Sequence, residues 1–218
     1  MSEKLPKVLL LETQLDHELD SYRSQARYMR EFFTNLPNLE FISKEVHSRA
    51  DLAKFLEMAR DDGTVRVVHL IAHGFPAEDH SRIVLTHDET IDLSEGKNLR
   101  LFRDLNADAL VLSCCGIGAN AQLMQRLVKA SGVEAAFSYT GDVEDYQAFV
   151  LEPLIYHLAY GTFRGAASQL VWFEVYERLL FATEILGIDG PKTTMVEPLL
   201  AASFRTSAPA GRTSPARS

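Results

Sequence analysis

The sequence is short of the residues that build disulfide-rich or membrane-spanning proteins. It has only two cysteines, the neighbours Cys114 and Cys115, and adjacent cysteines do not easily bridge to each other. A disulfide framework is therefore excluded, and this cysteine usage predicts a reducing compartment, the cytoplasm. No apolar run approaches the roughly 18 residues of a membrane span, and the N-terminal apolar run is too short for a signal peptide.

Basic residues are also scarce. Lys and Arg number 22 against 30 Asp and Glu, which gives a net charge of -8. Such a chain repels phosphate backbones and anionic membrane surfaces, so we expect neither a nucleic-acid partner nor a membrane partner. With 46% hydrophobic residues, 12 glycines and 8 prolines among 218 residues, the composition is that of a folded globular protein.

The order of apolar segments predicts the fold class. Short apolar runs near 8–11, 39–42, 65–72, 107–112 and 133–139 alternate with segments whose apolar residues recur at helical spacing. Such alternation predicts an α/β protein of three layers, α/β/α, with a mostly parallel central sheet. Two alternating runs at 82–86 and 90–93 predict a small β-hairpin excursion beside that sheet.

The C-terminal segment differs in composition from the rest. Residues 201–218 are small and polar, with three arginines and no acid. This composition predicts a disordered basic tail after a single domain that spans 1–200.

Two of the predicted strands end in chemically reactive side chains. The run 65–72 leads into His73 and Gly74, and the run 107–112 leads, after one serine, into the two cysteines. Because ligands bind at the carboxyl ends of parallel strands, we expect the imidazole and a thiol to meet there. A base beside a thiol is the minimum for covalent thiol catalysis. The glycine-flanked elbow and the residue order of α/β-hydrolases are absent.

These motifs resemble the caspase-like cysteine peptidases of clan CD, and most closely their bacterial CHAT branch. Residues 112–118 read Leu-Ser-Cys-Cys-Gly-Ile-Gly, similar to the Leu-Ser-Ala-Cys-x-Thr-Gly of CHAT domains. In caspases, too, a histidine lies about 50 residues upstream of the cysteine. An acidic loop at 142–145 follows the next strand, as in that family, and the resemblance extends over 65–190.

The resemblance implies a caspase-haemoglobinase-like fold and a role for each reactive residue. His73 becomes the general base and Cys115 the nucleophile, with backbone amides of Gly74 and Cys115 stabilising the oxyanion. The CHAT register, Cys-x-x-Gly, selects Cys115 with Gly118, whereas the caspase register, Cys-x-Gly, would select Cys114. We favour Cys115 because the Leu-Ser prefix fits the CHAT pattern, and we assign no third catalytic residue.

The resemblance also implies a substrate pocket at the ends of the main strands. The acidic candidates for it are Glu12, Asp16, Asp142, Glu144 and Asp145. An acidic pocket would favour Arg or Lys before the scissile bond. The implied function is a cysteine endopeptidase that cleaves protein or peptide substrates through a thioester acyl-enzyme, without a cofactor. By the same resemblance, a partner protein activates it in bacterial regulated proteolysis or defence.

Two other functions remain open from the sequence. The first is a catalytically inactive caspase-like binding module with a buried cysteine. The second is a metal-dependent hydrolase with zinc on His69, His73 and a cysteine, although the Glu of His-Glu-x-x-His is absent and we expect no metal. The acids at 142–145 also have a purely structural interpretation, as carboxylates at a helix N-terminus.

Overall fold

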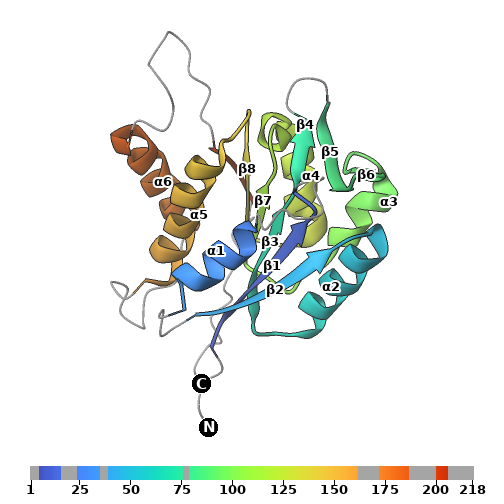
Figure 1. The fold of residues 1–218 in the computed structure, drawn as a ribbon, viewed down its shortest axis with the longest axis horizontal. Coiled ribbons are helices and arrows are strands. Elements are labelled where there is room, and N and C mark those ends of the chain that lie inside the picture. The colour runs from blue at the N-terminus through green and yellow to red at the C-terminus, as the bar shows by residue number, and fades with distance from the viewer. Residues whose placement is uncertain are drawn as a thin grey trace, which may run out of the picture.

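The computed structural model describes residues 5–15, 24–34, 39–75, 79–161, 172–186 and 200–205. A six-stranded sheet with the order β2-β1-β3-β7-β8-β9 forms its centre (Figure 1). Its first five strands are parallel, and β9 runs antiparallel to β8. The strands are β1 (Lys7–Thr13), β2 (Glu40–Val46), β3 (Val65–Ile71), β7 (Ala109–Ser113), β8 (Ala135–Tyr139) and β9 (Leu200–Phe204).

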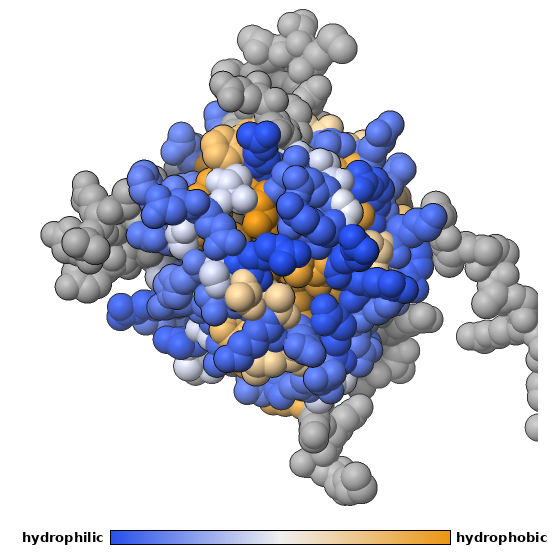
Figure 2. All heavy atoms as spheres, turned by 90° about the vertical axis from the view of Figure 1, so that its right-hand side faces the viewer, coloured by the Kyte–Doolittle hydropathy of each residue, from blue (hydrophilic) through white to orange (hydrophobic). Residues whose placement is uncertain are grey.

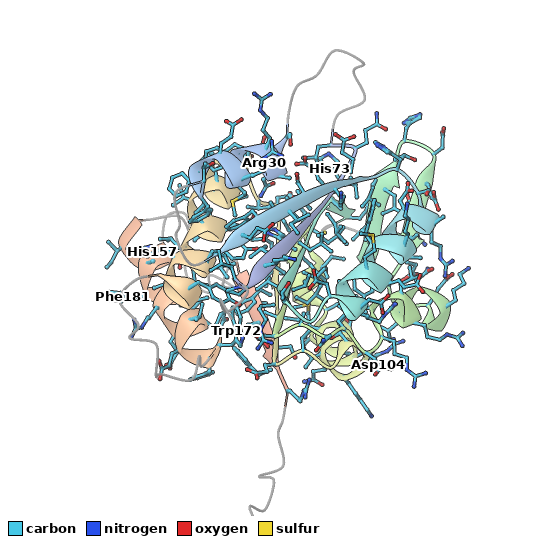
Figure 3. The ribbon with its side chains drawn as sticks, turned by 90° about the horizontal axis from the view of Figure 1, so that it is seen from below. Arg30, His73, Asp104, His157, Trp172 and Phe181 are labelled. Atoms are coloured by element: carbon cyan, nitrogen blue, oxygen red, sulfur yellow. The ribbon has the colours of Figure 1, made fainter. Side chains whose placement is uncertain are left out.

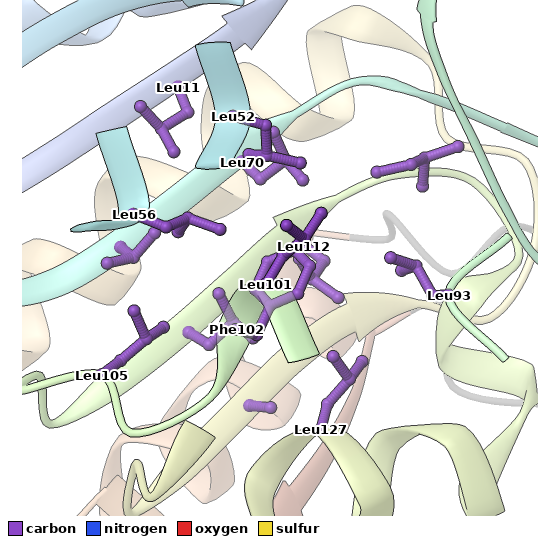
Figure 4. Close-up of a cluster of buried hydrophobic side chains, with 14 of the residues drawn as sticks. Leu11, Leu52, Leu56, Leu70, Leu93, Leu101, Phe102, Leu105, Leu112 and Leu127 are labelled. Carbon is purple, nitrogen blue, oxygen red and sulfur yellow. The ribbon is translucent and has the colours of Figure 1, made fainter. Parts of the chain in front are cut away.

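Helices cover both faces of the sheet, which confirms the predicted three-layer α/β fold with a mostly parallel sheet. One face packs against α1 (Gln25–Phe32), α5 (Asp145–Tyr160) and α6 (Trp172–Leu186). The other packs against α2 (Arg49–Asp61), α4 (Ala121–Ser131) and the short α3 (Gly96–Leu99). Figure 4 shows the leucine-rich core on this second side. Strands covered on both faces read as continuous apolar runs, which is why β3 and β7 stand out in the sequence.

Side-chain caps mark the start of two helices. The Ser48 side chain accepts a hydrogen bond from the backbone of Asp51 at the start of α2, and Asn120 caps α4 in the same way. These caps satisfy backbone donors that have no partner within the helix. The apolar residues at helical spacing predict longer helices over 16–36 and 164–186, of which the structure describes α1 and α6, because 16–23, 35–38 and 162–171 lie outside the described residues.

The predicted β-hairpin is part of a second, three-stranded antiparallel sheet. It consists of β4 (His73–Phe75), β5 (Asp79–Thr86) and β6 (Glu89–Asp92). The backbone amide of Ala72 still donates to the Ser113 carbonyl at 3.1 Å, which keeps the chain beside β7 up to this point. The chain then leaves the main sheet, and His73 begins β4 two residues after β3 ends at Ile71.

The start of the expected C-terminal tail needs correction. Residues 201–204 belong to β9, which pairs with β8 in the register Ala135↔Phe204 to Tyr139↔Leu200. The Phe204 ring lies 6.4 Å from that of Phe137 between centroids. Strand β8 offers an open hydrogen-bonding edge, and pairing there outweighs the weak local strand propensity of Leu-Ala-Ala-Ser-Phe. Residues 206–218 lie outside the described residues.

The polar character of the surface agrees with a composition in which 24% of the residues are charged. Figure 2 shows the side of the molecule that carries α2 and α3, where hydrophilic side chains dominate and apolar ones form small separate patches. Within the described residues, no helix combines the length and the apolar character needed to cross a bilayer.

Candidate active site

The structure brings the His73-Gly74 segment directly against Cys115. A Cβ atom placed on Gly74 would overlap the carbonyl oxygen of Cys115 and would lie 3.0 Å from its backbone nitrogen. Only glycine allows two backbones to approach this closely. The strand ends of β3 and β7 therefore meet as the sequence predicts, and the catalytic roles of His73 and Cys115 stay predictions.

A backbone carbonyl orients the imidazole of His73. Its Nε2 atom lies 2.5 Å from the carbonyl oxygen of Leu15, just after β1. A carbonyl can only accept a hydrogen bond, so Nε2 carries the proton and the neutral ring keeps Nδ1 as its basic nitrogen. In Figure 3, His73 and Asp104, which precedes β7, lie at opposite edges of the molecule. This role of Leu15 has no signature in the sequence, because any residue supplies a carbonyl.

The two cysteines have different surroundings. Cys114 is 1% exposed and packs among the apolar side chains on the α2 and α4 side, whereas Cys115 is half-buried. Burial raises the pKa of the Cys114 thiol far above its ordinary range, and the neighbouring thiol adds to this. The pKa of Cys115 is also raised, mainly by burial and further by the negative charges of Asp142 and Asp145, while the Val143 amide opposes the shift.

Glycines shape the turn that follows Cys115. Gly116 has φ of 77°, a left-handed conformation, and its amide donates to the carbonyl of Gly141 at 3.2 Å. A Cβ on Gly118 would lie 2.7 Å from the Ser138 carbonyl oxygen. Each of these positions therefore requires glycine for a structural reason. The two contacts connect the loop after β7 to the loop after β8, which carries the acids.

The predicted pocket acids separate into groups with different surroundings. Asp142 and Asp145 act electrostatically on Cys115 and so lie near it. Glu144 caps α5 in a capping box with Gln147, which is the structural role considered for this loop. Glu12 is 8% exposed and accepts hydrogen bonds from the Ser24 hydroxyl at 2.5 Å and from two amides that open α1, those of residues 25 and 26. Asp16 lies outside the described residues.

A buried polar cluster beneath the site was missed from the sequence. The carboxylate of Glu152, in α5, accepts a hydrogen bond from Tyr139 at 2.9 Å and another from Gln25, and it lies 3.3 Å from Nε2 of His69. A signal existed, because Glu152 is an isolated acid in the apolar stretch 148–156. An isolated acid on a buried helix needs polar partners in the core.

The arrangement gives no support to the zinc alternative. His69 is completely buried and contacts Glu152 and Tyr156. Across the part of the chain that the structure describes, His, Cys, Asp and Glu side chains do not gather in threes in a way that would hold a metal ion.

A three-layer α/β fold with these two groups at adjacent strand ends defines the caspase-like class. The sequence profile of the CHAT domain matches residues 12–151, and the chain belongs to this caspase-like clan CD family. A comparison with curated proteins finds no match.

Among solved structures, the crystal structure of metB from Corynebacterium glutamicum is 16% identical, with a TM-score of 0.31. The match covers 84% of this chain and 42% of that one, so the chain spans less than half of that protein's length. Identity and TM-score are too low for this likeness to bear on function.

Proposed function

We propose that this protein is a cysteine endopeptidase with His73 as general base and Cys115 as nucleophile. One observation carries the proposal: the backbones of Gly74 and Cys115 are in contact, which places a histidine with an oriented ring beside a partly accessible cysteine. Membership in a caspase-like cysteine peptidase family supports it. Cys114 is the weaker candidate because its thiol is buried in the core on the α2 and α4 side.

The chemistry follows from the orientation of the imidazole. Nδ1 of His73 takes the thiol proton, and the Sγ thiolate of Cys115 attacks the peptide carbonyl. The amides of Gly74 and Cys115 are the proposed donors to the resulting oxyanion. His73 then returns the proton to the leaving amine, which leaves a thioester, and water activated by the same Nδ1 hydrolyses it. The Leu15 carbonyl holds the ring in one tautomer throughout.

We further propose that the acids after β8 select a cationic residue before the scissile bond. The negative charges of Asp142 and Asp145 raise the pKa of Cys115. A bound Arg or Lys would offset their charge, so it would lower the thiol pKa as it binds. A substrate with Arg or Lys before the scissile bond would thus favour the thiolate form of Cys115 that attacks it. Glu12 is less suited to this role because its oxygens already cap α1.

The decisive experiment uses peptidyl acyloxymethyl ketones with Arg, Lys, Leu, Asn or Asp in the leading position, followed by intact-mass measurement. We expect one adduct, strongest with Arg or Lys, that is absent in His73→Ala and Cys115→Ala. Cys114→Ala is the matched control, and it should be labelled like the unchanged protein. An adduct that survives Cys115→Ala but disappears in Cys114→Ala would transfer the role to Cys114.

The second candidate function is that of a binding module without catalytic activity, or of an enzyme that stays inactive until a protein partner binds. The raised pKa of Cys115 favours it, because a protonated thiol is a poor nucleophile. In the absence of a partner, no adduct with any probe would support this candidate. An adduct that forms with the isolated chain would exclude the inactive module and make an activating partner unnecessary for the acylation step.

A further inference from the structure

A buried carboxylate that the proposed chemistry does not use lies beneath the dyad. Glu152 is 1% exposed, and burial of a charge is costly unless it is well paired. Its Oε1 accepts from the Tyr139 hydroxyl at 2.9 Å, and its Oε2 accepts from Nε2 of Gln25. Nε2 of His69 lies 3.3 Å from the same Oε2. Four polar side chains from β3, β8, α1 and α5 therefore converge in the core.

A second tyrosine contacts His69 in this cluster. The Tyr156 hydroxyl lies 2.6 Å from Nδ1 of His69, and burial together with the charge of Glu152 raises the pKa of this phenol well above its ordinary value. The phenol therefore stays protonated and can donate to Nδ1. Nε2 of His69 lies 3.3 Å from the carboxylate without a hydrogen bond to it, so Tyr139 and Gln25 supply the hydrogen bonds that Glu152 accepts from this cluster.

Gln25 connects this cluster to both halves of the candidate site. Its Nε2 also lies 3.4 Å from Oγ of Ser113, the last residue of β7 and two residues before Cys115. Its backbone amide donates to Glu12 at the end of β1 at 2.5 Å. Three residues further on, β1 leads to the Leu15 carbonyl that orients the histidine. Gln25 thus joins the strand before the proposed nucleophile, through its side chain, to the segment that holds the proposed base, through its backbone amide.

We propose that Glu152 is a positioning residue that acts through Gln25 and keeps Cys115 within reach of His73. The inference rests on the proposed dyad. Without an acceptor at Oε2, the Gln25 amide would turn toward another partner, and the ends of β1 and β7 would lose their shared contact. A displacement of about 1 Å between reacting groups is enough to cost about a hundredfold in rate.

The test compares Glu152→Gln, Gln25→Glu with Glu152→Gln, and the control Tyr156→Phe. Glu152→Gln cannot accept at both oxygen positions, so an amide donor faces the donors of Gln25 or Tyr139. The double variant reverses the polarity of this contact and restores it. Tyr156→Phe removes a buried hydrogen bond of the same cluster on the far side of His69, away from Ser113.

The readout is the rate at which iodoacetamide alkylates Cys115 at pH 7, with His73→Ala as the rate without a dyad. We expect Glu152→Gln to be slower by about tenfold or more, the double variant to recover most of the loss, and Tyr156→Phe to react like the unchanged protein. Loss of a negative charge near a thiol would by itself favour the thiolate and speed the reaction, so slower labelling reports position. With a cleaved peptide, kcat should fall and KM should not change.

Two results overturn the inference. One is a Glu152→Gln rate equal to that of the unchanged protein while His73→Ala is slow, and the other is an equal loss in Tyr156→Phe. If Glu152→Gln does not fold, Ser113→Ala takes its place and should also slow labelling, because it removes the 3.4 Å contact; an unchanged rate there overturns the inference as well. A His73→Ala rate equal to that of the unchanged protein would refute the dyad itself, which separates the two failures.

Discussion

Gly74→Ala is the sharpest test of the contact on which the site depends. The added Cβ would overlap the Cys115 carbonyl oxygen and lie 3.0 Å from the Cys115 backbone carbon and nitrogen. These are backbone atoms and cannot swing aside, so the two chain segments must separate by about 1 Å. Overpacking of this kind costs about 1–3 kcal/mol, and for a chain of this size each kcal/mol lowers Tm by about 2–4 °C.

We therefore expect a Tm lower by about 2–12 °C and Cys115 labelling slower by up to about a hundredfold. Differential scanning calorimetry and timed alkylation measure the two effects. Gly96→Ala is the matched control, because a Cβ on Gly96 meets nothing within 4 Å. Its effect on stability should stay within about 0.5 kcal/mol. A Gly74→Ala protein that melts and reacts like the Gly96→Ala protein would refute the close contact and the argument for the dyad.

Three further predictions concern acidic side chains. Asp142→Asn should shift the pH profile of Cys115 alkylation to lower pH, because it removes a charge that raises the thiol pKa; an unchanged profile would contradict this. Glu12→Gln should lower stability by about 1–2 kcal/mol in denaturant titrations and leave KM unchanged, because this side chain caps α1. Hydrogen bonds from Thr64 and Lys7 lower the Asp62 pKa, so the stability difference between Asp62→Ala and the unchanged protein should be present at pH 7 and shrink as pH falls below about 4. A pH-independent difference would contradict this last prediction.

The central strands and the meeting of His73-Gly74 with Cys115 were predictable because they depend on local patterns. Apolar runs identify β3 and β7, and parallel strands in one sheet place their ends together. The difference between the cysteines is less local, because β7 ends at Ser113 and both cysteines lie in the turn region after it. Cys114 is nevertheless the buried one of the two.

Other features depend on contacts between distant parts of the chain. Strand β9 forms because β8 offers it an edge, and nothing within 200–204 encodes that partner. The Leu15 carbonyl lies far from His73 in sequence and carries no residue signature. Glu12 was a candidate for the substrate pocket because it lies at the end of the first strand, yet its oxygens accept from the start of α1. The position of a side chain at a strand end predicts the region in which it lies, but it does not predict its hydrogen-bond partners.

The fit of Gly74 against the Cys115 backbone bears on how relatives of this chain should be compared. A relative that keeps this packing must keep a residue without a side chain at that position, whether or not it cleaves anything. Glycine there would therefore persist during descent even after catalysis was lost. This close packing does not require a histidine at the preceding, half-buried position 73. A relative in which His73 is substituted and the glycine is retained would therefore have lost the proposed catalysis and kept the fold.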